Sequence, residues 1–178
     1  MLSKVYRMRL ILTALLLLTA FSSFAQSSTV KSQAEQMGKA LIRKDYKAFV
    51  TFSYPAILSQ MGGAEKMEAN IARQMEAMES GGAKIIGLSY GAPSAIVKEG
   101  SELQCTIPQH MVVELSVGKV ASGSTLIALS NDNGKRWYFV DAGERDLATV
   151  RKSLPNASRR LKYRSPLLRS SLSSARPP

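Results

Sequence analysis

The chain is poor in the residues on which most metal and disulfide sites depend. Its 178 residues include one cysteine, Cys105, and one histidine, His110. One thiol cannot form an internal disulfide, so we expect an apolar core alone to stabilise the fold. A zinc site needs several cysteine and histidine ligands at short spacings, and one of each cannot supply them. Cys105 lies in an alternating apolar run, which predicts a buried small hydrophobic residue.

Signatures of nucleotide and acyl-transfer chemistry are missing as well. Gly62-Gly63 and Gly81-Gly82 lack the Lys-Ser/Thr pair of a phosphate loop, and no serine nucleophile elbow occurs. Met67, Met75 and Met78 share one helical face with Ile71, which favours core packing over a thioether copper site. We therefore predict no catalytic residue, no metal and no cofactor from motifs.

Acidic residues are absent from both ends of the chain, although the net charge is +11. Three basic residues lie in residues 1–25 and eight in residues 151–178. The remaining 13 lie in residues 26–150 together with all 13 acids, so this part is neutral. A nucleic-acid-binding domain carries a basic face of its own, so no nucleic acid is expected as a partner.

Residues 1–25 have the pattern of a secretory signal peptide. Lys4, Arg7 and Arg9 precede an apolar run from Leu10 to Ala20. Ser23-Phe24-Ala25 places small residues before a cleavage site after Ala25. The run is short for a membrane span, which needs about 20 residues, although an uncleaved N-terminal anchor stays open as an alternative. We predict an exported protein, periplasmic or secreted.

Apolar spacing predicts helices in the first half of the domain. After a short polar linker at residues 26–29, Ser28 or Thr29 can cap a helix with an apolar face made by Val30, Ala34, Met37 and Leu41. Asp45 can cap a second, short helix, and Pro55 suits the first turn of a third that ends at Gly62-Gly63. A longer helix is predicted from about Ala64 to Glu79.

The apolar period then changes from that of a helix to that of strands. The longest run places Leu103, Cys105, Ile107, Met111, Val113, Leu115 and Val117 on one parity, which only Gln109 breaks. Gly118-Lys119 is predicted as a two-residue turn. Residues 126–129 are apolar on both parities, as in a central strand, and Asn131-Asp132-Asn133-Gly134 predicts another hairpin before a last strand from Arg136 to Val140.

A final helix is predicted from Asp146 to Leu154, ending at Pro155. The chain therefore divides into a signal peptide at 1–25, one α+β domain at 26–156 and a basic, disordered tail at 157–178. In this α+β domain, N-terminal helices pack on a curved, cone-like antiparallel sheet and a short C-terminal helix follows. The tail can bind an anionic surface through four basic residues: Arg159, Arg160, Lys162 and Arg164.

This order of elements resembles the nuclear transport factor 2-like superfamily, which has a cone-shaped α+β fold. The features that carry the resemblance are the opening helix, the segment from Asp45 to Phe49, the Tyr54-Pro55 break and the turn and strand from Asp132 to Val140. The resemblance covers about residues 29–154 and implies a cavity at the open end of the cone. It does not imply one function, because that fold carries enzymes, binding modules and assembly domains.

Three hypotheses follow, and they differ in their candidate residues. The first is a non-enzymatic domain that binds a small apolar or amphipathic ligand, or a protein partner, in or around a cavity with Tyr54, Tyr90, His110 and Trp137 as tentative ligand-binding residues. The second is an acid/base enzyme that uses His110 and a tyrosine. It requires a bulge at Pro108 that turns His110 inward, since without one His110 points away from the main core. The third is an envelope-associated protein that uses the basic tail.

Overall fold

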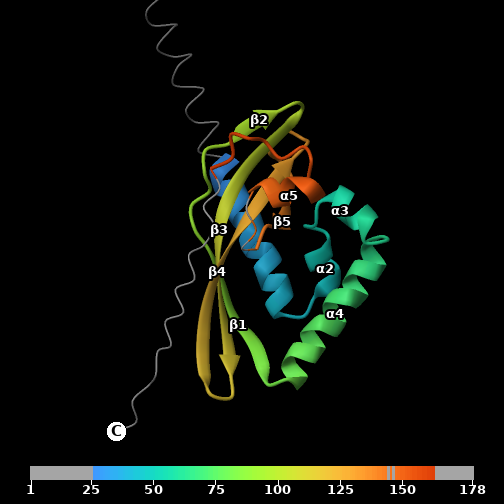
Figure 1. The fold of residues 1–178 in the computed structure, drawn as a ribbon, viewed down its shortest axis with the longest axis vertical. Helices are drawn as coiled ribbons and strands as arrows, with labels where there is room; N and C mark the ends of the chain where they lie inside the picture. The colour runs from blue at the N-terminus through green and yellow to red at the C-terminus, as the bar shows by residue number, and fades with distance from the viewer. Residues whose placement is uncertain (1–25, 144, 146, 163–178) are drawn as a thin grey trace, which may run out of the picture.

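The computed structural model describes residues 26–143, 145 and 147–162 (Figure 1). The predicted signal peptide and most of the predicted tail lie outside the described residues. The described chain is an α+β fold in which N-terminal helices pack on a strongly curled antiparallel sheet and a short helix follows the sheet. This confirms the predicted fold class.

The N-terminal helix covers residues 26–42, and Val30, Ala34 and Met37 are buried on the face that the spacing predicts. The predicted linker at residues 26–29 and the predicted cap at Ser28 or Thr29 are wrong, because these residues are already helical. Side-chain hydrogen bonds explain the difference. Gln26 Nε2 donates to the carbonyl of Asn133, and Gln33 Nε2 donates to that of Lys135, so this helix is held against the turn before the last strand.

Three further helices follow: α2 (Tyr46–Val50), α3 (Pro55–Gln60) and α4 (Ala64–Ser80). As predicted, the Asp45 carboxylate caps α2 by accepting the backbone N–H of Ala48 at 3.0 Å, and Pro55 opens α3. The methionine-rich face of α4 differs from the prediction in one respect. Met67, Ile71, Met75 and Met78 are half-buried rather than enclosed, so α4 covers the fold loosely.

The sheet contains β1 (Ala83–Tyr90), β2 (Val97–Glu99), β3 (Glu102–Leu115), β4 (Gly118–Ser130) and β5 (Tyr138–Asp141). Its order is β1-β3-β4-β5, with β2 also paired to β3. The β3–β4 register runs without interruption from Leu103↔Ser130 to Leu115↔Gly118. Ser116 and Val117 therefore form the turn that was predicted at Gly118-Lys119. Gly118 has a φ of +140°, which glycine adopts easily, so it ends the turn and starts β4.

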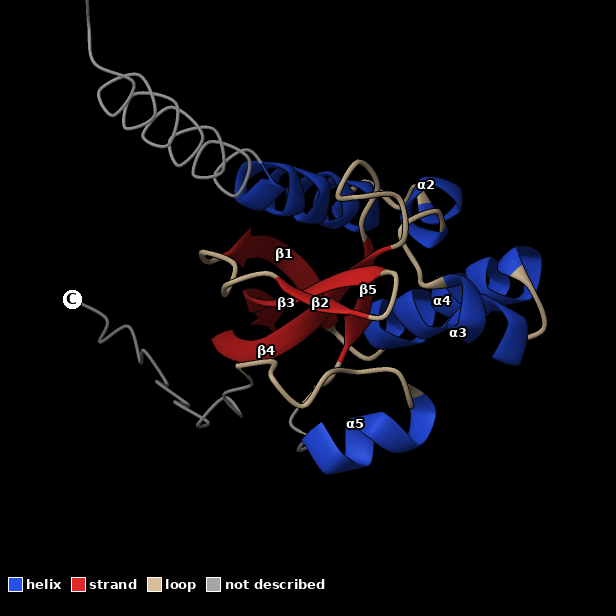
Figure 2. Ribbon diagram, turned by 90° about the horizontal axis from the view of Figure 1, so that it is seen from above, coloured by secondary structure: helices blue, strands red, loops and turns tan. Residues whose placement is uncertain are grey.

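Alternate residues of β4 supply two apolar cores, one on each face of the sheet. Leu126 and Ala128 pack with the N-terminal helix, whereas Ile127 and Leu129 pack with the C-terminal helix α5 (Leu147–Ser153). Figure 2 shows the N-terminal helix and α5 on opposite sides of the sheet. The two-sided apolar pattern of residues 126–129 thus correctly indicates a central strand.

The domain continues beyond residue 156, where the tail was predicted to begin. Ala157, Ser158 and Leu161 are buried against the outer face of the sheet. The backbone N–H of Ser158 donates to Gln104 Oε1 at 2.9 Å, and Thr106 Oγ1 donates to the carbonyl of Lys162 at 2.8 Å. Gln104 and Thr106 are buried polar residues of β3 that need partners, and residues 157–162 supply them.

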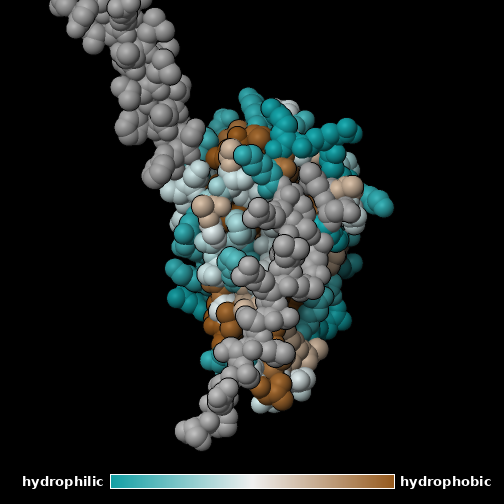
Figure 3. All heavy atoms as spheres, turned by 60° about the vertical axis from the view of Figure 1, so that its left-hand side comes forward, coloured by the Kyte–Doolittle hydropathy of each residue, from teal (hydrophilic) through white to brown (hydrophobic). Residues whose placement is uncertain are grey.

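Apolar side chains also reach the surface at the far end of the β3–β4 hairpin. Val117, in the turn, is 91% exposed, and Ile86 in β1 is 37% exposed. Figure 3 shows brown, apolar atoms gathered at this lower end of the molecule, below a more hydrophilic middle. Single exposed apolar residues are common on protein surfaces, so these two do not define a binding site by themselves.

Candidate functional site

A cavity of about 290 Å³ lies between the concave face of the sheet and the helices. This volume is at the small end of the range for small-molecule sites, about 300–1,000 Å³. The helical wall is mainly apolar and consists of Met37, Leu41, Phe49, Ser53 and Met67. The sheet wall combines apolar and polar groups and consists mainly of Leu88, Tyr90, Gln109, Met111, Ser122, Ser124, Leu126, Phe139 and Asp141. The cavity is therefore apolar on one side and polar on part of the other.

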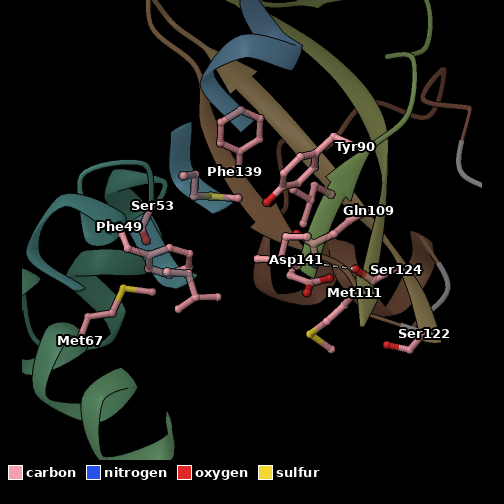
Figure 4. A pocket seen from close by; sticks show the side chains of 14 residues that line it. Phe49, Ser53, Met67, Tyr90, Gln109, Met111, Ser122, Ser124, Phe139 and Asp141 are labelled. Atoms are coloured by element: carbon pink, nitrogen blue, oxygen red, sulfur yellow. Dashed lines mark hydrogen bonds between the residues drawn. The ribbon is translucent and has the colours of Figure 1, made fainter. Parts of the chain in front are cut away.

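The alternation of the strands explains which residues of the sheet reach the cavity. Gln109 and Met111 share the inward parity of β3, and Ser122 and Ser124 share the inward parity of β4. Figure 4 shows these four residues and Asp141 on the sheet side, opposite Phe49 and Met67 from the helices. Gln109 Nε2 donates to Ser124 Oγ at 3.1 Å, so two of the polar groups are already paired.

Tyr90 is the polar group of this cavity that lacks a partner. Its side chain is 6% exposed, and within the described residues its hydroxyl has no hydrogen-bond partner. Burial raises the pKa of Tyr90 above its ordinary value, and the negative charges of Asp141 and Glu35 raise it further, so the hydroxyl stays protonated. Tyr90 lines the cavity from β1, and its hydroxyl lies at the side of the cavity next to Gly38 of the N-terminal helix (Figure 4). An unpaired buried hydroxyl costs about 1–3 kcal/mol, which a bound hydrogen-bonding group would recover.

Asp141, at the end of β5, places a carboxylate at the cavity. Its Oδ1 accepts the backbone N–H of Gly143 at 2.7 Å, which orients the carboxylate. Asp141 itself is exposed, so it marks the side of the cavity that is open to solvent. The site thus has an apolar interior, a buried hydroxyl at Tyr90 and a negative charge at its mouth.

The structure brings one of the four predicted ligand-binding residues, Tyr90, to this cavity. His110 pairs with Ser89 and Gly123 in the sheet, lies between the inward residues Gln109 and Met111, and is exposed on the outer face. The bulge that would turn it inward is absent at Pro108, because the β3–β4 register is regular there. The irregularity of the described sheet lies in β1 instead, between Ile85 and Gly87.

Tyr54 and Trp137 are held in other parts of the fold. The Tyr54 hydroxyl donates to Glu102 Oε1 at 2.7 Å and accepts from Asn156 Nδ2 at 3.1 Å. The Trp137 side chain is fully buried in the core on the helical side of the sheet, where its Nε1 donates to the carbonyl of Gly134 at 3.0 Å. Both residues therefore stabilise the fold, and neither lines the cavity.

Sequence reasoning missed the polar wall of the cavity. Gln109 was noted as the one residue that breaks the inward apolar parity of β3, and this break was the signal for a polar group facing the cavity. Asp141 directly follows the predicted last strand, and a strand end at the open side of a curled sheet is where the mouth of a cavity lies. Nothing local in the sequence distinguishes Ser122 and Ser124 from other strand serines.

The part of the chain that the structure describes contains no metal site and no reactive thiol. There, no three histidine, cysteine, aspartate or glutamate residues are grouped closely enough to hold an ion. Cys105 is fully buried, as predicted, and burial raises the pKa of its thiol to about 12. A thiol that stays protonated at neutral pH is a poor nucleophile and a poor metal ligand.

Three of the four predicted tail cations are described, and all three are exposed: Arg159, Arg160 and Lys162. Arg160 donates to the carbonyl of Lys98 and lies 3.7 Å from the Glu99 carboxylate. Arg164 lies outside the described residues. All three thus lie on a segment that packs on the domain, and Arg160 is next to an acid of β2.

Comparison with known proteins gives no assignment. No model of a protein family matches the chain, and no curated protein matches it either. Among the helices of the described residues, none is both long and apolar enough to cross a membrane. The cavity geometry is therefore the basis for the functional argument.

Proposed function

We propose that the domain is a non-enzymatic binding protein for a small apolar or amphipathic molecule, held in the cavity between the sheet and the helices. The observation that carries the proposal is the Tyr90 hydroxyl, which is buried, unpartnered within the described residues and placed at the wall of a largely apolar cavity. Native proteins rarely leave a buried polar group unpaired without a reason, and a ligand that supplies the partner is one such reason.

The composition of the walls supports a molecule that is mostly apolar. Phe49, Phe139 and Leu126 offer rigid apolar surface, and Met37, Met67 and Met111 offer side chains that adapt to irregular shapes. The half-buried face of α4 fits this role, because a loosely packed helix can move to admit a ligand. The cavity volume corresponds to that of about ten water molecules in the liquid, so the occupant is a single ring or a short chain.

The position of His110 argues against the acid/base enzyme hypothesis. That hypothesis requires the imidazole to face the cavity, and the imidazole lies on the other face of β3. Tyr90 and Asp141 are then the titratable groups that line the cavity, and a phenol with a raised pKa beside a carboxylate has no proton-transfer partner of intermediate pKa. A binding function needs no proton-transfer partner.

A calorimetric titration with benzyl alcohol tests the proposal, because this probe has one apolar ring and one hydroxyl. We expect saturable binding to the protein and loss of binding in Ser122→Phe, which fills the cavity from β4. Ala121→Phe is the matched control, since Ala121 neighbours Ser122 but is exposed on the outer face. Equal binding by Ser122→Phe and the unaltered protein would contradict the proposal.

We also propose that the fold is a member of the nuclear transport factor 2-like superfamily and that the protein is exported. The helices on a curled antiparallel sheet are compatible with the cone of that superfamily. Export is supported by the charge and apolar pattern of residues 1–25. N-terminal sequencing of protein from the cell envelope or medium should give Gln26 as its first residue, and an intact Met1 would contradict cleavage.

A further inference from the structure

We infer that the cavity selects apolar amines over apolar carboxylic acids, with the protonated amine at the mouth beside Asp141. This inference rests on the proposed binding function and names the chemical class of the ligand. Its basis is the distribution of charge around the cavity. Among the described residues that line it there is no lysine, arginine or histidine, and the charged residue among them is the acid Asp141.

The electrostatic potential at the Tyr90 hydroxyl is also made negative by nearby carboxylates. Two carboxylates, Asp141 and Glu35, act on the Tyr90 hydroxyl, and both disfavour further negative charge there. An anionic head group placed next to Tyr90 would leave water and meet these carboxylates, and no described residue that lines the cavity carries a positive charge to compensate it, which is unfavourable. A cationic head group at the same place would be attracted by both of them.

The neighbouring cation, Arg145, does not reverse this field at the cavity. Its Nη2 donates to the backbone carbonyl of Asp141 at 2.9 Å, and its Nε donates to that of Ala142 at 3.2 Å. The guanidinium keeps its positive charge in these bonds, but Arg145 does not line the cavity and is not among the charges that act on the Tyr90 hydroxyl. The Asp141 carboxylate is held separately, through the N–H of Gly143.

Uncharged groups of the wall also suit an ammonium head. The N–H donors of an ammonium group can be accepted by the Asp141 carboxylate, and the cavity wall also carries neutral hydroxyl oxygens. Phe139 and Tyr90 also place aromatic rings in the wall, and aromatic rings attract cations that lie over their faces. A carboxylate ligand could accept hydrogen bonds from the hydroxyl groups of the same wall, but it would also meet the repelling charge of Asp141.

Three probes of one shape test the inference: benzylamine, benzyl alcohol and benzoate, each titrated calorimetrically at neutral pH and low salt. We expect benzylamine to bind about tenfold more tightly than benzoate, with benzyl alcohol between them. Asp141→Asn keeps an oxygen for the N–H of Gly143 and should weaken benzylamine about fivefold, with little change for benzyl alcohol. Glu114→Gln removes the same charge from the outer face of β3 and should change neither.

The outcomes separate this inference from the function on which it rests. Benzoate binding as tightly as benzylamine, with benzyl alcohol also bound, would overturn the charge selection and leave the binding function standing. An unchanged benzylamine affinity in Asp141→Asn would also overturn it. Failure of all three probes to bind would instead contradict the binding function itself.

Discussion

A Cβ atom on Gly38 would lie 2.6 Å from the hydroxyl oxygen of Tyr90 and 3.0 Å from its ring carbon Cε2. The Tyr90 ring therefore passes the N-terminal helix at a point where the helix has no side chain. Gly38 lies inside that helix, where glycine costs about 1 kcal/mol relative to alanine, so its presence is explained by the close approach of Tyr90. Gly38 thus sets the position of the cavity's unpaired hydroxyl.

Gly38→Ala should weaken ligand binding without stabilising the fold. The added methyl group forces Tyr90 to shift, and this strain offsets the gain of about 1 kcal/mol in helix propensity. Titration with benzyl alcohol and thermal unfolding of the variant measure the two effects. A variant that binds normally and unfolds at a clearly higher temperature would show that Tyr90 and Gly38 are not in contact.

The same contact predicts coupling between Gly38→Ala and Tyr90→Phe. Removing the hydroxyl removes the shortest of the three close approaches, 2.6 Å, and leaves ring contacts at 3.0 Å and 3.2 Å that a small shift relieves. Gly38→Ala should therefore be tolerated better in the Tyr90→Phe background, by about 1 kcal/mol in a double-mutant cycle of unfolding free energies. Additive effects would argue against the close approach.

Tyr90→Phe alone should separate stability from binding. The hydroxyl is buried without a partner in the described chain, so its removal should leave the free energy of unfolding unchanged or raise it by up to about 1 kcal/mol. Binding of benzyl alcohol should become weaker, because its hydroxyl loses a partner. Denaturant unfolding and titration of the same variant measure both quantities, and a large loss of stability would indicate that Tyr90 is bonded within the fold.

The sequence predicts the fold class because burial follows periodicity. Val30, Ala34 and Met37 show the helical period, and residues 126–129 show the two-sided apolar run of a central strand. The cavity is harder to predict from the sequence. Tyr90 and Trp137 are both aromatic residues in predicted strands, and only the packing of the fold determines which of them lines a cavity. The position of His110 depended on the register at Pro108, and a proline in a strand does not reveal whether a bulge accompanies it.

The composition of the sequence also does not predict where the domain ends. Residues 157–162 are basic and polar, which favours a tail, yet their backbone bonds and small apolar side chains pack on β3 and α5. A chain that ends at residue 156 should therefore be less stable than one that ends at residue 162, by several kcal/mol, since it uncovers Gln104 and a core. Equal unfolding midpoints for the two truncated chains would contradict this packing.

The turn before β5 predicts a specific acid sensitivity. Asp132 accepts the backbone N–H groups of Lys135 and Arg136 and the hydroxyl of Ser130, and the bond from Arg136 is the main reason that the pKa of Asp132 is lowered. A lowered pKa means that the carboxylate stabilises the fold above the ordinary aspartate value, about 3.9, and that this contribution is lost as the pH falls through the lower, folded value.

Asp132→Asn should therefore lower the unfolding free energy by roughly 1 kcal/mol at neutral pH and by less below about pH 4. Denaturant unfolding of both proteins across this pH range measures the difference. Glu114→Gln is the control, because that acid lies on the exposed outer face of β3. A difference that stays constant down to pH 2 would show that the Asp132 charge has no part in the turn.

The most direct test of the account is to locate a bound ligand with the methionines. Met37, Met67 and Met111 line the cavity from three different elements, whereas Met61 is exposed and does not line it. Spectra of protein labelled with carbon-13 in its methionine methyl groups would be recorded during titration with benzyl alcohol. We expect saturable shifts at Met37, Met67 and Met111 and none at Met61. Unmoved cavity methyl groups at saturating probe, or shifts confined to Met61, would contradict it.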